Sequence, residues 1–168
     1  MPIVRMPTPD WDRVIELTLK SSFLFSRAIA REMIPRKQGR IINIASLAGK
    51  IAGPLMGPYS AAKFGVVGLT QVLAKELGRY SITVNAVCPG FVYTPGFEKT
   101  FLAMKDLYPA LQDKSPEEIF TDTVKQQTVL GQPQTPEDVG SLVAYLASEE
   151  AKNITGQAIS VDGGAAMG

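Results

Sequence analysis

The sequence predicts an α/β fold in which helices pack against a parallel sheet. Two observations carry this prediction. Helix-like and strand-like segments alternate along the 168 residues, in the order helix, strand, helix, strand, insertion, helix, strand. This alternation is typical of parallel strands joined by helical crossovers. The strand-like segments are short apolar runs, as expected for strands buried on both faces. The length suits one domain, so we take residues 1–168 as a single unit.

Three of the expected helices begin with the same pattern of a hydroxyl residue, a proline and an acid. The starts are Thr8-Pro9-Asp10, Ser115-Pro116-Glu117 and Thr135-Pro136-Glu137. The hydroxyl can cap the first turn, proline suits the first helical position, and the acid lies at the positive end of the helix dipole. They predict helices at 9–34, 116–127 and 136–148. The first of these also has apolar residues at helical spacing: Trp11, Val14, Ile15, Phe25, Ile29 and Met33.

Apolar runs predict three strands, at residues 40–46, 82–88 and 158–161. Pro89-Gly90 stops the second strand, and Asp162-Gly163-Gly164 closes the third. A helix at 59–78 lies between the first two strands. It is rich in small residues that allow another helix or a ligand to approach closely: Ser60, Ala61, Ala62, Gly65 and Gly68.

The segment 91–133 is a long insertion between a strand and a helix, with short helices expected at 97–105 and 116–127. An insertion of this length is often a functional lid, and we expect it to cover a substrate.

Composition excludes several function classes. A net charge of +1 argues against a nucleic-acid or membrane partner bound by bulk charge. Because Cys88 is the only cysteine, no intrachain disulfide can form, and we expect a cytoplasmic protein. The chain has no histidine, which removes Ser-His-Asp catalysis and histidine metal sites, so we predict no metal site. Acid–base chemistry is left to Tyr, Lys, Asp or Glu.

The pair Tyr59 and Lys63 is the strongest candidate for such chemistry. Residues at i and i+4 of a helix share a face, so both side chains can point into one cleft. A free tyrosine has a pKa near ~10, and a nearby cation favours its phenolate form. A tyrosine tuned in this way can move a proton to or from a substrate oxygen. Taken singly, each residue fits an ordinary surface position equally well.

The ordered motifs resemble the short-chain dehydrogenase/reductase family over nearly the whole chain. The resemblance rests on Ser46, Tyr59-Ser60-Ala61-Ala62-Lys63, Asn85-Ala86-Val87-Cys88-Pro89-Gly90, Thr94, Thr155-Gly156-Gln157 and Asp162-Gly163-Gly164. A Tyr-x-x-x-Lys spacing alone is a weak signal, whereas the ordered set is specific. The resemblance implies a Rossmann-like three-layer αβα fold. It also implies hydride transfer between NAD or NADP and a small ketone, a polyol, a sugar or a ketoacyl thioester.

The resemblance also implies a role for each matching residue. Tyr59 would be the acid/base on the substrate oxygen. Lys63 would lower the Tyr59 pKa and bind the nicotinamide ribose, and Ser46 would hold the substrate oxygen. Pro89, Gly90, Val92 and Thr94 would line the nicotinamide pocket together with Tyr59 and Lys63. Family members assemble through their two long helices, here 9–34 and 59–78, so a homodimer or homotetramer is implied.

The sequence departs from the family in two places. It contains no G-x-G-x-x-G turn, and about the first third of a typical member has no counterpart. We therefore expect a truncated domain whose strand 40–46 forms an apolar edge and which binds NAD(P) poorly by itself. Thr18 stands where the family has an asparagine that helps to hold a relay water. Two other readings stay open: a non-catalytic assembly module, and an epimerase or dehydratase, which the Pro89-Gly90 and Asp162-Gly163-Gly164 segments fit less well.

Overall fold

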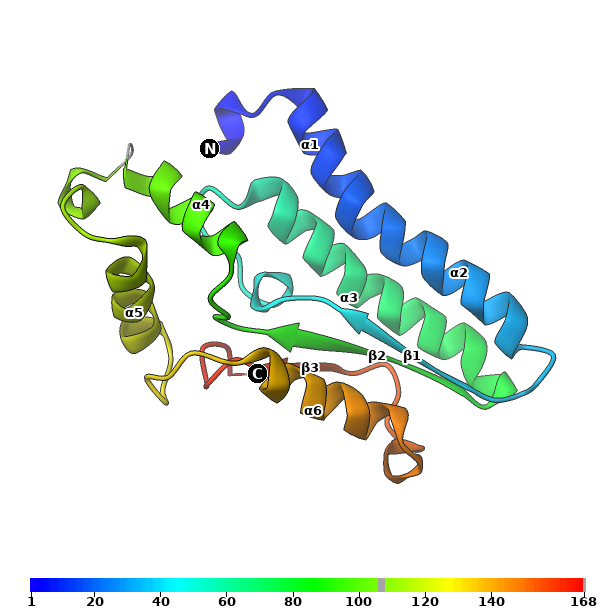
Figure 1. The fold of residues 1–168 in the computed structure, drawn as a ribbon. Helices are drawn as coiled ribbons and strands as arrows, with labels where there is room; N and C mark the ends of the chain where they lie inside the picture. The colour runs from blue at the N-terminus through cyan, green and yellow to red at the C-terminus, as the bar shows by residue number, and fades with distance from the viewer. Residues whose placement is uncertain (106–107, 168) are drawn as a thin grey trace.

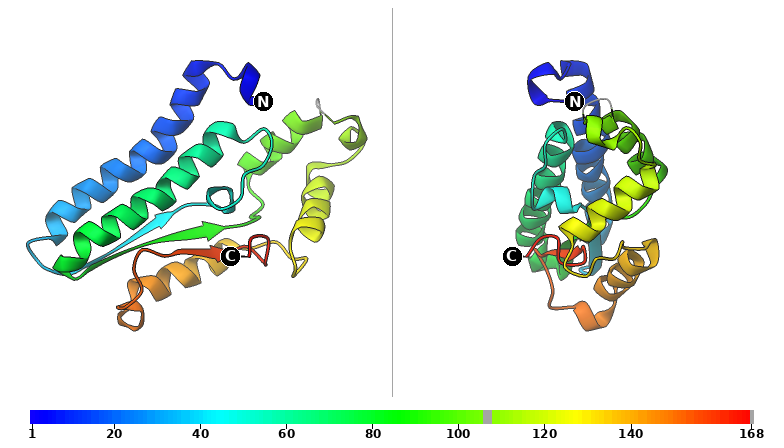
Figure 2. Two further views of the ribbon diagram at one scale, coloured as in Figure 1. Left: turned by 180° about the vertical axis from the view of Figure 1, so that it is seen from behind. Right: turned by 90° about the vertical axis from the view of Figure 1, so that its left-hand side faces the viewer.

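The computed structural model describes residues 1–105 and 108–167 and has three layers. The helices α2 (Ser21–Met33) and α3 (Gly57–Leu77) cover one face of the sheet, and α6 (Pro136–Ala147) covers the other (Figures 1 and 2). Helix α1 (Thr8–Ile15) precedes α2 and packs on α3. The sheet contains β1 (Gly39–Ile44), β2 (Ile82–Pro89) and β3 (Ala158–Val161). Among the described residues, no helix is long and apolar enough to cross a membrane. The predicted α/β class is confirmed.

The sheet is parallel, in the order β1-β2-β3. Ile44 pairs with Val87, and Pro89 pairs with Val161, so the carboxyl ends of all three strands lie at the same edge. Every residue of β2 except Pro89 is buried, which explains its near-continuous apolar sequence. Asn85 is a buried polar residue of β2. Its side chain donates to the Ile154 carbonyl at 2.8 Å and accepts from the Gln157 amide at 3.1 Å. It ties β2 to the start of β3.

The predicted first helix consists of α1, a π-helical turn at Glu16–Lys20 and α2, which follow one another without a break. The prediction that Thr8 caps it is wrong. The helix begins one residue earlier than expected, with Pro7 at the cap position, and no side chain caps it. The Pro7 carbonyl accepts from the Asp10 and Trp11 amides, so Thr8 already lies inside the first turn. At the two later starts the hydroxyl residue caps the helix as expected. Each of them also forms a capping box, Ser115 with Glu118 and Thr135 with Asp138.

The apolar repeat of the first helix predicts the helix correctly, yet it does not mark the buried face of α2. Phe25 is 74% exposed and Ile29 is also exposed, whereas the buried residues are Ser26 and Ala30. Ser26 Oγ donates to Asn43 Oδ1 on β1 at 3.3 Å. The helix therefore approaches the sheet through small and polar side chains and turns large apolar ones outward.

The predicted lid contains α4 (Pro95–Lys105) and α5 (Pro116–Gln127), which lie beyond the carboxyl ends of the strands (Figure 1). Residues 106 and 107 of this segment are outside the described part. The two helices meet in an aromatic cluster, in which the Phe101 and Phe120 ring centroids are 6.4 Å apart. This cluster packs on Leu47, the residue that follows Ser46. The segment is thus anchored next to the end of β1.

Strand β1 lies at the end of the sheet, as the expected apolar edge requires. Ile44, at its carboxyl end, is 47% exposed. Within the described residues, β1 pairs with β2 alone, so its other edge has no neighbouring strand.

Candidate active site

The candidate site lies where the carboxyl ends of β1 and β2 meet the first turns of α3. The pairing of Ile44 with Val87 places Ser46 beside the segment that begins at Pro89. In parallel α/β sheets, ligands bind at this edge because the loops that leave adjacent strands surround a common crevice.

Tyr59 and Lys63 lie together on α3, as their spacing predicts. The Lys63 ammonium is 5.6 Å from the centroid of the Tyr59 ring, and both residues are half-buried. Lys63 Nζ also donates to the Ile44 carbonyl oxygen at 2.8 Å. The lysine therefore connects α3 to the end of β1, two residues before Ser46.

The Ile44 carbonyl is free to accept this bond because it points away from β2. The Ala45 amide donates to the Val87 carbonyl at 2.7 Å, and neighbouring residues of a strand point their polar groups to opposite sides. An ammonium group has three donors, so the bond to Ile44 fixes the Lys63 side chain and leaves two donors for a ligand. Burial of the ammonium lowers the pKa of Lys63, and the nearby Cys88 partly opposes this effect.

Ser46 begins a short turn that packs directly on α3. Its Oγ accepts from the Ala48 amide at 3.1 Å, which leaves the hydroxyl proton available to a ligand. A Cβ at Gly49 would lie 2.8 Å from the Lys63 carbonyl oxygen, so only glycine lets the turn approach α3 this closely. The close contact keeps Ser46 near the turn of α3 that carries Lys63.

The segment Pro89, Gly90, Val92 and Thr94 leaves β2 toward α4. The Gly90 amide donates to the Val161 carbonyl at 2.9 Å, which extends the pairing with β3. Thr94 is exposed, and its Oγ1 accepts from the Phe97 amide at 3.3 Å, so it helps to start α4. The structure thus places these residues on one continuous segment next to the strand end, with Thr94 at its outer limit.

The geometry offers one feature that suits the nicotinamide end of a dinucleotide cofactor, because Lys63 has donors of the kind that bind ribose hydroxyls. The side of Gly90 that lacks a Cβ faces Gln134 and Asp162. The pyrophosphate end is different, because no G-x-G-x-x-G turn occurs in the sequence to receive it. The fit is therefore to one half of the cofactor.

Sequence reasoning missed two features of the structure near these residues. The first is the π-helical turn at Thr18. Its carbonyl accepts from Ser22 Oγ at 2.8 Å and from Ser21 Oγ at 3.2 Å, so side-chain hydroxyls satisfy the backbone there. The second is Gln134, a buried side chain that bonds to the main chain of Phe91 at 2.8 Å. A hydroxyl-rich stretch, Ser21-Ser22, was the only available hint of the first.

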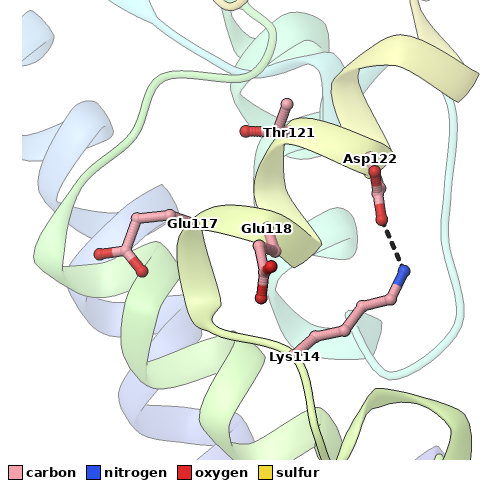
Figure 3. A pocket seen from close by; sticks show the side chains of 5 residues that line it. All are labelled: Lys114, Glu117, Glu118, Thr121 and Asp122. Carbon is pink, nitrogen blue, oxygen red and sulfur yellow. Dashed lines mark hydrogen bonds and ion pairs between the residues drawn. The ribbon is translucent and has the colours of Figure 1, made fainter.

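Two surface hollows of the described chain do not include Ser46, Tyr59 or Lys63. A hollow of about 330 Å³ on α5 is lined by Lys114, Glu117, Glu118, Thr121 and Asp122 (Figure 3). Its charged groups already have partners: Lys114 pairs with Asp122 at 2.6 Å, Glu118 accepts from the Ser115 amide and Glu117 accepts from Tyr93. They serve the start of α5. A second hollow of about 760 Å³ includes Gln134 and Asp162.

Comparison with known proteins gives consistent matches across the chain. A family model described as enoyl-(acyl carrier protein) reductase matches residues 1–166. The (3R)-3-hydroxyacyl-CoA dehydrogenase of Rattus norvegicus is 40% identical over 166 residues, which are 98% of this chain and 58% of the rat protein.

Two solved structures are also similar. An actinorhodin polyketide ketoreductase with NADPH has a TM-score of 0.87 and 37% identity, over 96% of this chain and 61% of its own. A 4-hydroxyisoleucine dehydrogenase with NADH has a TM-score of 0.82 and 29% identity, over 100% of this chain and 64% of its own. The chain thus spans about three fifths of the length of these proteins.

Proposed function

The chain belongs to the short-chain dehydrogenase/reductase family, and on that premise we propose that the whole protein is a nicotinamide-dependent oxidoreductase. Its substrate would carry a carbonyl or an alcohol. The observation that carries the proposal is the Lys63 ammonium, which is held 2.8 Å from the Ile44 carbonyl and 5.6 Å from the Tyr59 ring. A nearby cation favours the phenolate form through which a tyrosine can act as an acid/base.

The proposed roles follow from the chemistry of each group. Tyr59 gives a proton to the substrate oxygen or takes one from it. The Ser46 hydroxyl donates to the same oxygen and keeps it next to Tyr59. Lys63 supports the phenolate form of Tyr59 and binds ribose hydroxyls with its two remaining donors. NAD or NADP, when bound, supplies or accepts the hydride. Pro89, Gly90, Val92 and Thr94 hold the nicotinamide end, and residues 91–133 act as the lid that excludes water.

Among the substrate classes, we favour a β-ketoacyl or 3-hydroxyacyl thioester over a small ketone, a polyol or a sugar. The rat relative is named a hydroxyacyl-CoA dehydrogenase, and one similar structure is a polyketide ketoreductase. The similar structures hold NADPH in one case and NADH in the other, so both cofactors enter the test. A reducing, cytoplasmic location is part of the proposal.

The test measures nicotinamide oxidation with acetoacetyl-CoA, using NADH and NADPH in turn. Tyr59→Phe should lower kcat on the order of 10²–10⁴-fold, because it removes the proton that general acid catalysis needs. Tyr145→Phe, on the exposed side of α6, is the matched control and should keep normal activity. Near-normal turnover by Tyr59→Phe would refute the assigned role.

A second candidate function is an assembly module, and one observation favours it. The outer face of α3 presents an exposed stripe of Ala61, Phe64, Gly68 and Val72, spaced for one side of a helix. Exposed apolar stripes of this kind mark interfaces, and we propose a homodimer or homotetramer through α3 and α2.

Light scattering tests the assembly. Phe64→Glu should lower the assembled mass, whereas Val129→Glu, an exposed apolar residue far along the chain, should not. A nucleotide titration of the whole protein then separates the two functions: a whole protein that assembles and binds neither NADH nor NADPH would support the module and not the enzyme.

A further inference from the structure

Gln134 forms hydrogen bonds with both main-chain groups of Phe91, its amide and its carbonyl. The Phe91 amide donates to Gln134 Oε1 at 2.8 Å, and the Gln134 amide donates to the Phe91 carbonyl at 2.9 Å. Gln134 Nε2 in turn donates to the Gln132 carbonyl at 3.0 Å, so both ends of the side-chain amide are engaged. The residue is 8% exposed. Gln134 therefore takes the place of a neighbouring strand at the point where β2 has ended.

The residue before Phe91 is fixed by the same contact. A Cβ at Gly90 would lie 2.5 Å from Gln134 Oε1 and 2.7 Å from the Cα of Asp162. Gly90 is thus enclosed between the Gln134 side chain and the main chain that follows β3. Asp162 is itself rigid, because its carboxylate accepts from the Gly164 and Ala166 amides, each at 3.0 Å.

We propose that Gln134 is a positioning residue for the segment from Gly90 to Thr94. It fixes the Phe91 main chain and so sets the direction in which the Val92 backbone and Thr94 face the nicotinamide. The inference rests on the proposed function for the role of that segment, but the contacts that carry it do not. Because Gln134 lies between α5 and α6, the same contact joins the end of the lid to the floor of the site.

The physical basis is the cost of an unpaired buried group. Without Gln134 Oε1, the Phe91 amide has no acceptor among the residues that the structure describes, and a buried unpaired amide favours a different path of the chain. Thr94 lies three residues further along, so a small rotation at Phe91 moves it away from the strand end. Such a change would lower the affinity for a ligand that is bound by backbone contacts more than it would lower the stability of the domain.

The test uses one disruptive variant, one rescue and one matched control. Gln134→Leu has a similar length and removes both polar atoms. Gln134→Glu keeps an oxygen acceptor for the Phe91 amide in either protonation state. Thr128→Val is the control, because Thr128 is equally buried and its Oγ1 accepts from the Gly131 amide in the same loop. It disturbs the loop without touching Phe91.

Two measurements are made on each variant. Amide hydrogen exchange reports the protection of Phe91 and Val92 without any ligand, and fluorescence titration reports the Kd for NADH and NADPH. Gln134→Leu should lose the protection of Phe91 and bind nucleotide roughly tenfold more weakly, the effect of one lost buried hydrogen bond. Gln134→Glu should restore both values, and Thr128→Val should match the wild type at Phe91.

Several results would overturn the inference. Full protection of Phe91 in Gln134→Leu would show that this side chain does not hold the segment. Equal losses in Thr128→Val would show that the effect is general loosening of the loop. Lost protection with unchanged nucleotide affinity would show that the segment is held but does not position the cofactor. If the wild type binds neither nucleotide, hydrogen exchange alone decides whether Gln134 fixes Phe91, and the proposed function is decided separately by turnover of the whole protein.

Discussion

Replacing Gly90 by alanine tests how closely the strand ends are packed at the candidate site. The added methyl group would lie 2.5 Å from Gln134 Oε1, 2.7 Å from the Asp162 Cα and 2.8 Å from the Asp162 Cβ. Ordinary carbon contacts are ~3.5–4.0 Å, so at least one neighbour must shift. The shift is costly because the Gln134 side chain is held by two hydrogen bonds. Asp162 is also held, since its carboxylate accepts from two main-chain amides. Overpacking of this kind typically costs about 1–3 kcal/mol.

Urea unfolding followed by circular dichroism measures this cost as a change in the free energy of unfolding. Gly140→Ala is the matched control, because it lies within α6 and its new Cβ would meet no described atom within 4 Å. Alanine in an open helical position should stabilise by ~0.5–1 kcal/mol. Each kcal/mol corresponds to about 2–4 °C in Tm for a protein of this size. If Gly90→Ala were as stable as the wild type, or gained stability like Gly140→Ala, the close packing described here would be wrong.

Three further predictions concern charge, capping and the core. Because burial lowers the pKa of Lys63 below its ordinary 10.5, the unfolded chain binds that proton more tightly, and the stability contributed by this side chain should rise as the pH approaches 10.5. The difference in urea midpoint between the wild type and Lys63→Met should show this rise, and a flat difference would contradict it. Thr135→Ala removes the acceptor of the Asp138 amide at 3.2 Å and should cost ~1 kcal/mol. Thr8→Ala should change the free energy of unfolding by no more than about 0.5 kcal/mol, since the Thr8 side chain caps no helix. If thermal unfolding showed equal losses for Thr8→Ala and Thr135→Ala, Thr8 would have to be a cap as well. Leu146→Ala, at a side chain that is 0% exposed, should cost ~2–5 kcal/mol in the same assay, and a loss no larger than that of the exposed Tyr145→Ala would contradict the burial.

The sequence predicts the elements well because each depends on a local signal. The Ser115 and Thr135 starts are correct, since a capping box involves only neighbouring residues. The same pattern of a hydroxyl residue, a proline and an acid gives the wrong cap at Thr8. The helix starts one residue earlier, with Pro7 at the cap position, and Pro7 is not part of that pattern. The outward turn of Phe25 could not be predicted either. Helical spacing shows that a face is apolar, and only the tertiary contact of Ser26 with Asn43 decides which face is buried.

The site divides in the same way. The pairing of Tyr59 with Lys63 follows from helix geometry, and the structure places the two together. The bond from Lys63 to the Ile44 carbonyl depends on which way the main chain of β1 points, which no side-chain pattern records. The contact of Gln134 with Phe91 joins residues 43 positions apart. Both missed contacts use main-chain groups, and main-chain groups look alike in every sequence.

These main-chain contacts explain how the site can exist beside an open strand edge. The carbonyl that receives Lys63 belongs to the row of β1 groups that faces away from β2, where a further strand would pair. A carbonyl oxygen has two lone pairs, so Ile44 can accept from Lys63 and from a neighbouring strand at the same time. The orientation of Lys63 is therefore set by β1 itself and does not require the edge to be covered. A strand added at that edge would shield the ammonium from water and strengthen its attraction for a phenolate, because charges interact more strongly at lower effective dielectric constant. The geometry of the pair is present in this chain, and its electrostatic environment depends on what lies against β1.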